Sequence, residues 1–64
     1  MTPFQYAKSE LLAGRFPSMP VEHIAGSFYL CDRDWNILKG SKSYQSKDHA
    51  MHDRSKILDR ARKG

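Results

Sequence analysis

Two histidines and the single cysteine are the side chains best suited to holding a metal ion. His49 and His52 stand three residues apart, a spacing that turns both imidazole rings toward one side of a helix. With Cys31 or His23 they would make a three- or four-ligand zinc site. Zinc patterns bring their ligands in two close pairs, however, and the second pair is missing here. We expect solvated histidines and no cofactor, and metal binding by His49, His52 and Cys31 stays open as the alternative.

A second cation pattern lies at residues 32–36, whose sequence DRDWN sets carboxylate and amide oxygens at positions one, three and five of a calcium loop. The pattern breaks at Ile37, where such a loop needs glycine, and at Ser43, where it needs a bidentate glutamate. A hydrogen-bonded turn is the better interpretation. Covalent catalysis has no better support, because neither a Gly-x-Ser-x-Gly turn nor a glycine-rich oxyanion loop accompanies Cys31.

The length of the chain also argues against an enzyme. A chain of 64 residues has a thin core, since a domain of this size buries only about 60% of the surface that it exposes when unfolded. The apolar side chains that would wall a deep pocket are needed to hold the fold together. We therefore expect a single domain over residues 1–64 that binds a partner and catalyses no reaction, with a homodimer as an open alternative for its assembly.

Basic residues gather in the second half of the chain. From residue 39 to residue 64 there are eight lysines and arginines against three aspartates, a footprint typical of contact with nucleic acid. On a C-terminal helix, Lys56, Arg60 and Lys63 would share one side. The alternative is a solvated helix, in which Asp53 and Asp59 neutralise basic residues three or four positions away. The predicted nucleic-acid-binding residues are Lys39, Lys42, Lys47, Lys56, Arg60 and Lys63.

Aromatic residues give the alternative function. Trp35 lies at or beside a predicted turn, and tryptophan and arginine dominate the binding energy of protein interfaces. We therefore predict that Arg33, Trp35 and Tyr44 bind a partner. Trp35 and Tyr44 would stack on unpaired bases of DNA or RNA, as part of a nucleic-acid-binding module with a regulatory role. Alternatively, an aromatic patch around Trp35 would occlude a site on a larger acidic protein, which fits a regulator or inhibitor of viral or mobile-element origin. The competing interpretation makes Trp35 the main aromatic residue of the core.

Helices at both ends of the chain must position these residues. Thr2 and Gln5 form the capping-box pattern around a proline, and Gly14 supplies a stop, which predicts a helix over residues 3–13. Ser46 is suited to capping a second helix. From residue 47 to residue 62 the apolar residues recur on one face, which predicts an amphipathic helix there.

Between the helices the sequence predicts a hairpin over residues 27–38. The runs 28–31 and 35–38 are rich in aromatic and aliphatic residues and are separated by three residues. Pro17 and Pro20 argue against strand pairing further upstream, where we expect one helical turn over residues 21–25. The predicted fold is a small α+β domain of order α-β-β-α, with two helices packed on a two-stranded antiparallel hairpin.

The compartment follows from what the chain lacks. No basic stretch followed by an apolar run opens it, and the longest uninterrupted apolar run is residues 28–31, far short of the roughly 20 residues that a membrane span needs. A lone thiol suits a reducing compartment. We expect a cytoplasmic protein with no membrane contact.

Overall fold

The computed structural model describes residues 1–63, and the first element is helix α1, Pro3–Leu12. The hydroxyl of Thr2 accepts a hydrogen bond from the amide of Gln5 at 3.2 Å, and the Gln5 side chain accepts one from the amide of Thr2 at 3.0 Å. Pro3 occupies the first turn, where its missing N–H costs nothing. The predicted helix over residues 3–13 is confirmed to within one residue.

The hairpin lies upstream of the predicted position. Strand β1, Val21–Ile24, pairs antiparallel with strand β2, Ser27–Leu30, so the helical turn predicted over residues 21–25 is wrong. Ala25 and Gly26 make the connection with φ values of 50° and 81°, the backbone of a two-residue turn that suits strand twist. Pro20 does not block the pairing, because that position contributes its carbonyl, which accepts from the amide of Cys31 at 2.9 Å.

Residues 35–38, predicted as the second strand, form no strand. Their only pairing of this kind among the described residues is an isolated bridge between Ile37 and Cys31. Asp32 explains the failure, because its carboxylate accepts from the amides of Asp34 and Asn36 and folds residues 32–36 into a turn. Trp35 then takes a φ of 65°, which is incompatible with an extended strand.

Helix α2, Lys47–Lys63, confirms the predicted C-terminal helix. The hydroxyl of Ser46 accepts from the amide of His49 at 3.2 Å, as the capping prediction requires. Just before the helix, Tyr44 bridges to Phe28 through two backbone hydrogen bonds of 2.9 Å. The segment that leads into α2 is therefore attached to the edge of the hairpin.

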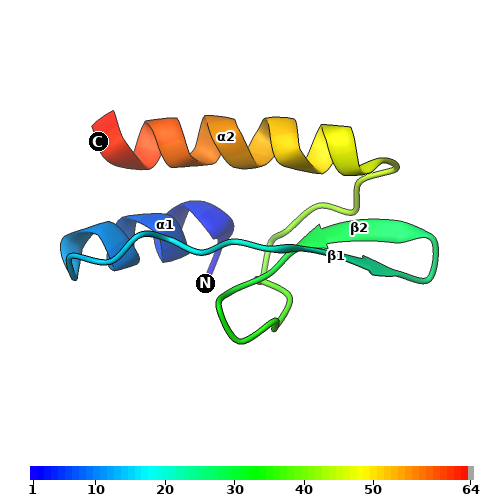
Figure 1. Ribbon diagram of the computed structural model, residues 1–64, viewed down its shortest axis with the longest axis horizontal. Helices are drawn as coiled ribbons and strands as arrows, with labels where there is room; N and C mark the ends of the chain where they lie inside the picture. The colour runs from blue at the N-terminus through cyan, green and yellow to red at the C-terminus, as the bar shows by residue number, and fades with distance from the viewer. Residues whose placement is uncertain (64) are drawn as a thin grey trace.

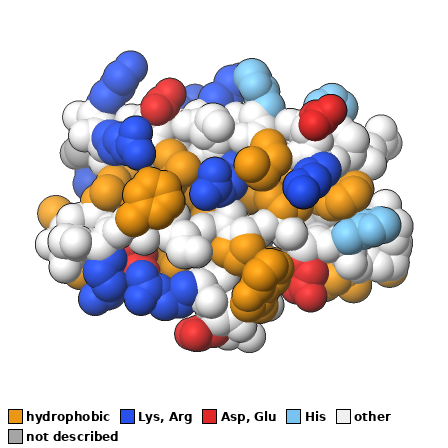
Figure 2. Space-filling view, in the orientation of Figure 1, with side chains coloured by type: hydrophobic (Ala, Val, Ile, Leu, Met, Phe, Trp, Pro, Cys, Tyr) orange, Lys and Arg blue, Asp and Glu red, His pale blue; other side chains and the backbone are white. Residues whose placement is uncertain are grey.

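The elements form two layers, with α2 lying across both α1 and the hairpin (Figure 1). The predicted α+β fold of order α-β-β-α is confirmed. Hydrophobic side chains gather along the seam between α2 and the layer beneath it (Figure 2). Within residues 1–63 no helix is long and apolar enough to cross a membrane.

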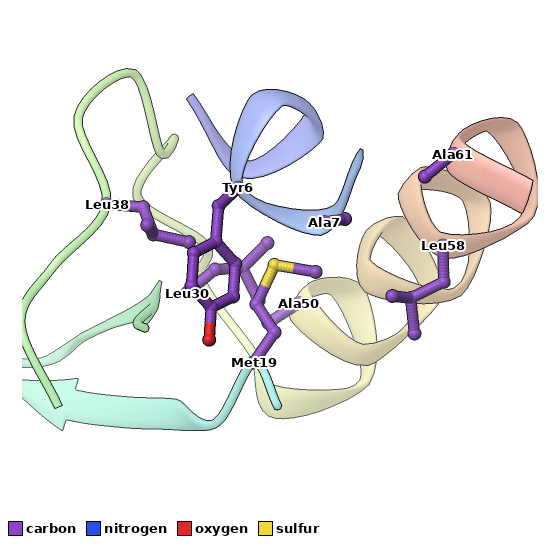
Figure 3. Packing of buried hydrophobic residues seen from close by; sticks show 8 residues of the cluster. All are labelled: Tyr6, Ala7, Met19, Leu30, Leu38, Ala50, Leu58 and Ala61. Atoms are coloured by element: carbon purple, nitrogen blue, oxygen red, sulfur yellow. The ribbon is translucent and has the colours of Figure 1, made fainter. Parts of the chain in front are cut away.

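The core sits where the three parts meet. Met19 and Leu30 are fully buried, and the ring of Tyr6 lies beside Leu30 and Leu38 (Figure 3). Small residues on the helices let them approach each other closely. The buried cluster comprises Tyr6, Ala7, Met19, Leu30, Leu38, Ala50, Leu58 and Ala61. Trp35 is not a member, so its interpretation as the main core aromatic is wrong.

Candidate nucleic-acid interface

One side of α2 carries a row of exposed cations. At 100° per residue, Lys56, Arg60 and Lys63 fall within about 60° of one another, and all three side chains are exposed. The buried side of the helix, marked by Ala50 and Ala61, lies well away from them. The row therefore faces solvent along the C-terminal half of α2.

These cations carry no internal counterion. Within residues 1–63 the ion pairs number two, and both involve Glu10 on α1. Asp53 instead accepts a hydrogen bond from Tyr44, and Asp59 is exposed without an ion pair to its helical neighbours. The alternative in which aspartates neutralise the basic residues of α2 is therefore not what the structure shows, and the positive charge stays available to a partner.

A shallow groove connects this row to the preceding loop. It has a volume of about 340 Å³, and Lys42 of the loop and Arg60 of α2 both line it, together with the first residues of α1. Gly40 lets the loop pass close to α1, since it has a φ of 81° and an added Cβ would stand 3.3 Å from Thr2 Cγ2. Lys42, Lys56, Arg60 and Lys63 together are called the basic face below.

The other two predicted contacts lie elsewhere. Lys47 is half a helical turn away from Lys56 around the axis of α2, so it points to the opposite side. Lys39 is exposed but lines no part of the groove. Arg54, a further basic residue of α2, is half-buried and donates from Nε to the carbonyl of Met19 at 2.8 Å, which makes it a structural residue.

Tyr44 is held in the fold. Its hydroxyl donates to Oδ2 of Asp53 at 2.8 Å, and the ring packs against the core as a half-buried side chain. Burial, reinforced by the Asp53 carboxylate, raises the pKa of Tyr44 to about 12. A ring fixed in this way does not serve as a platform for stacked bases, so we leave Tyr44 out of the interface.

Trp35 and Arg33 lie on a separate surface. The loop of residues 31–37, called the Trp35 loop below, projects from the side of the molecule away from α2 (Figure 1). Trp35 belongs to this loop and is 58% exposed. The structure therefore does not bring Trp35 together with the basic face, and stacking on a nucleic acid bound there is not available to it.

A cluster that the sequence did not indicate organises this second surface. The carboxylate of Glu10 is buried and binds Arg15 at 2.6 Å and Arg33 at 2.7 Å. Hydrogen bonds from Arg15, followed by the charges of both arginines, hold the pKa of Glu10 below its usual value despite its burial. The one available signal was the position of Glu10, four residues after Tyr6 on the same buried face of α1.

The residues predicted as alternative metal ligands do not converge. Within the described part of the chain no group of three His, Cys, Asp or Glu side chains is placed to hold a metal ion. His49 and His52 are exposed on α2, whereas Cys31 is buried beside Glu22. Burial and the Glu22 carboxylate raise the pKa of the Cys31 thiol to about 11, so it is a neutral thiol near pH 7.

Comparisons of the chain with models of known protein families, with curated proteins and with solved structures find no match. No relative therefore assigns a role to the basic face or to the Trp35 loop. Function has to be argued from charge, exposure and geometry alone.

Proposed function

We propose that this protein binds nucleic acid through the basic face and acts as a binding module without catalysing a reaction. The observation that carries the proposal is the exposure of Lys42, Lys56, Arg60 and Lys63 without an ion pair to any acid in residues 1–63. A solvated cation of this kind can exchange its counterion for a phosphate at little cost.

The arrangement favours the phosphate backbone as the recognised group. Lys56, Arg60 and Lys63 follow the axis of a straight helix and so can meet successive phosphates. Of the two aromatic rings that line the groove, Tyr44 is hydrogen-bonded to Asp53 and Phe4 is 38% exposed, and stacking on an exposed ring tolerates any base. We therefore expect binding with little sequence preference.

Salt dependence gives the proposal a number. Each phosphate contact on duplex DNA contributes about 0.9 to the slope of a plot of log binding constant against log salt concentration. Four contacts therefore predict that the binding constant falls with a slope of about 3.6. Between 50 and 200 mM salt this corresponds to a loss of affinity of about 150-fold.

The test is fluorescence anisotropy with a labelled 25-base-pair duplex and a labelled single-stranded RNA of the same length. In one variant Lys56, Arg60 and Lys63 are replaced by glutamine; in its matched control Lys39, Lys47 and Arg62 are replaced instead, so that the net charge is the same. We expect the first variant to lower the slope on duplex DNA by about 2.7 and the control to keep it.

Two results would overturn the proposal. Absence of binding to both probes at 50 mM salt would remove the function. Equal loss in the two variants would show that only the net charge matters and that the basic face is not the site.

A further inference from the structure

The backbone of Trp35 is unusual for its residue type. Trp35 has a φ of 65°, in the left-handed region that glycine and asparagine adopt readily and large side chains rarely do. Its indole is 58% exposed, so burial of the ring does not compensate for this conformation. Strained residues of this kind gather at functional sites, and an exposed tryptophan has no role in the core.

The Trp35 loop is held rigidly by its own hydrogen bonds. Oδ1 of Asp32 accepts from the amides of Asp34 and Asn36 at 2.9 and 3.0 Å. The backbone of Asp32 donates to the carbonyl of Asn36 at 2.9 Å and accepts from the amide of Trp35 at 3.0 Å. Because the loop is already ordered, docking the indole costs little conformational entropy.

Arg33 attaches the loop to α1. Its amide donates to the hydroxyl of Tyr6 at 3.1 Å, and its guanidinium binds Oε1 of Glu10 at 2.7 Å. Arg15 binds Oε2 of the same carboxylate through Nε and Nη2. One buried carboxylate thus holds two arginines, and these three residues together carry one net positive charge, with Asp32 and Asp34 on either side of Arg33.

The arginines keep donors for a partner. Their side chains are 54% and 45% exposed, whereas that of Glu10 is 7% exposed. Each guanidinium has five N–H donors, of which Glu10 occupies only some. Figure 2 shows Lys and Arg side chains gathered below α1, beside the projecting loop and its hydrophobic side chains.

We propose that Trp35, Arg33 and Arg15 form a docking surface for an acidic protein segment, whose carboxylates bind the two arginines and whose apolar side chains receive the indole. Tryptophan and arginine are the residue types that dominate interface energetics. Asp32 and Asp34 flank Arg33, so a phosphate backbone, which carries a charge at every step, would meet both aspartates, whereas a peptide can place its carboxylates opposite the arginines alone. The basic face lies on another side of the molecule and takes no part in this surface.

The sole tryptophan of the chain reports on this binding directly. The experiment selects 12-residue peptides from a random display library on the wild-type protein and counter-selects on Trp35→Asn, a substitution that suits the left-handed backbone. We expect net-negative peptides that combine Asp or Glu with Leu, Ile or Phe. Synthetic versions should shift the Trp35 emission to shorter wavelength and bind Arg33→Gln at least tenfold more weakly, with Arg62→Gln as the matched control.

The outcomes are decisive in either direction. Selection of no peptides, or of neutral or basic ones, would overturn the proposal, as would a peptide that binds Trp35→Asn and wild type equally. Should Trp35→Asn fail to fold, the peptide must still protect the wild-type indole from acrylamide quenching. Trp35→Asn should bind duplex DNA as tightly as the wild type does. If Trp35→Asn bound DNA more weakly and the selection gave no acidic peptides, the Trp35 loop would be assigned to nucleic acid. The basic face is tested separately by its own variants.

Discussion

The hydroxyl of Tyr44 donates a hydrogen bond to Oδ2 of Asp53 over 2.8 Å and so fastens the incoming loop to the second turn of α2. Phe28 holds the same residue through its backbone. Tyr44 therefore joins the hairpin, the loop and the helix at one point, and it lines the same groove as Lys42 and Arg60.

The raised pKa of Tyr44 predicts a late step in an alkaline titration. One of the three tyrosines should ionise near pH 12 instead of near its ordinary value of 10.0. Because the folded state favours the neutral phenol, its contribution to stability is present below pH 10 and is lost as the pH rises toward 12. Absorbance at about 295 nm follows the ionisation.

Tyr44→Phe should remove that late step and lower the free energy of unfolding by about 1 kcal/mol, the usual contribution of a hydrogen bond. Tyr29→Phe is the matched control and should leave the late step in place. A late step that survives Tyr44→Phe would belong to another tyrosine and would contradict the raised pKa of Tyr44.

The lowered pKa of Glu10 predicts sensitivity to acid. Stability from the ionised carboxylate is present above the ordinary value of 4.5 and is lost as the pH falls through the lowered pKa of the folded state. The urea midpoint of the wild type should therefore drop between pH 5 and pH 2. Glu10→Gln should be less stable at pH 7 and should show a smaller drop.

Asp59→Asn serves as the control for Glu10→Gln, because Asp59 is exposed and makes no ion pair within the described chain. It should keep the acid dependence of the wild type. If Glu10→Gln retained the full dependence as well, the two arginines would not be bound to an ionised Glu10.

The turn between β1 and β2 predicts a stabilising substitution. Ala25 has a φ of 50° next to Gly26, and asparagine followed by glycine is the preferred pair for this two-residue turn. Ala25→Asn should raise the free energy of unfolding by about 0.5–1 kcal/mol, measured by urea denaturation. Ala13→Asn, at a φ of −83°, should not stabilise the fold. Destabilisation by Ala25→Asn would argue against this hairpin.

Local signals explain which elements were predictable. The two helices were predictable because the residues that cap a helix start lie within a few positions of one another in the sequence, as Thr2 and Gln5 do. The hairpin was misplaced because Asp32 closes residues 32–36 through side-chain hydrogen bonds that a search for apolar runs does not register. The residues of the true turn, Ala25-Gly26, gave only a weak signal, because the asparagine or aspartate that usually precedes glycine in such a turn is replaced by alanine.

Predicting the sites depended on how far apart their residues lie in the sequence. The row on α2 follows from helical spacing and was predictable, whereas the joining of Lys42 to Arg60 depends on how the loop packs on α1. Glu10 and Arg33 are 23 positions apart, and their ion pair arises from tertiary structure alone. For the same reason the separation of Trp35 from the basic face had no sequence signal.

The placement of α2 across the other elements has a consequence for synthesis of the chain. Ala50, Leu58 and Ala61 supply the helix's share of the buried cluster, and α1 and the hairpin meet in the core mainly beneath them. Residues emerging from a ribosome before α2 have no cover for their apolar side chains. We therefore expect residues 1–46 to acquire a stable fold only once α2 is free to pack on them.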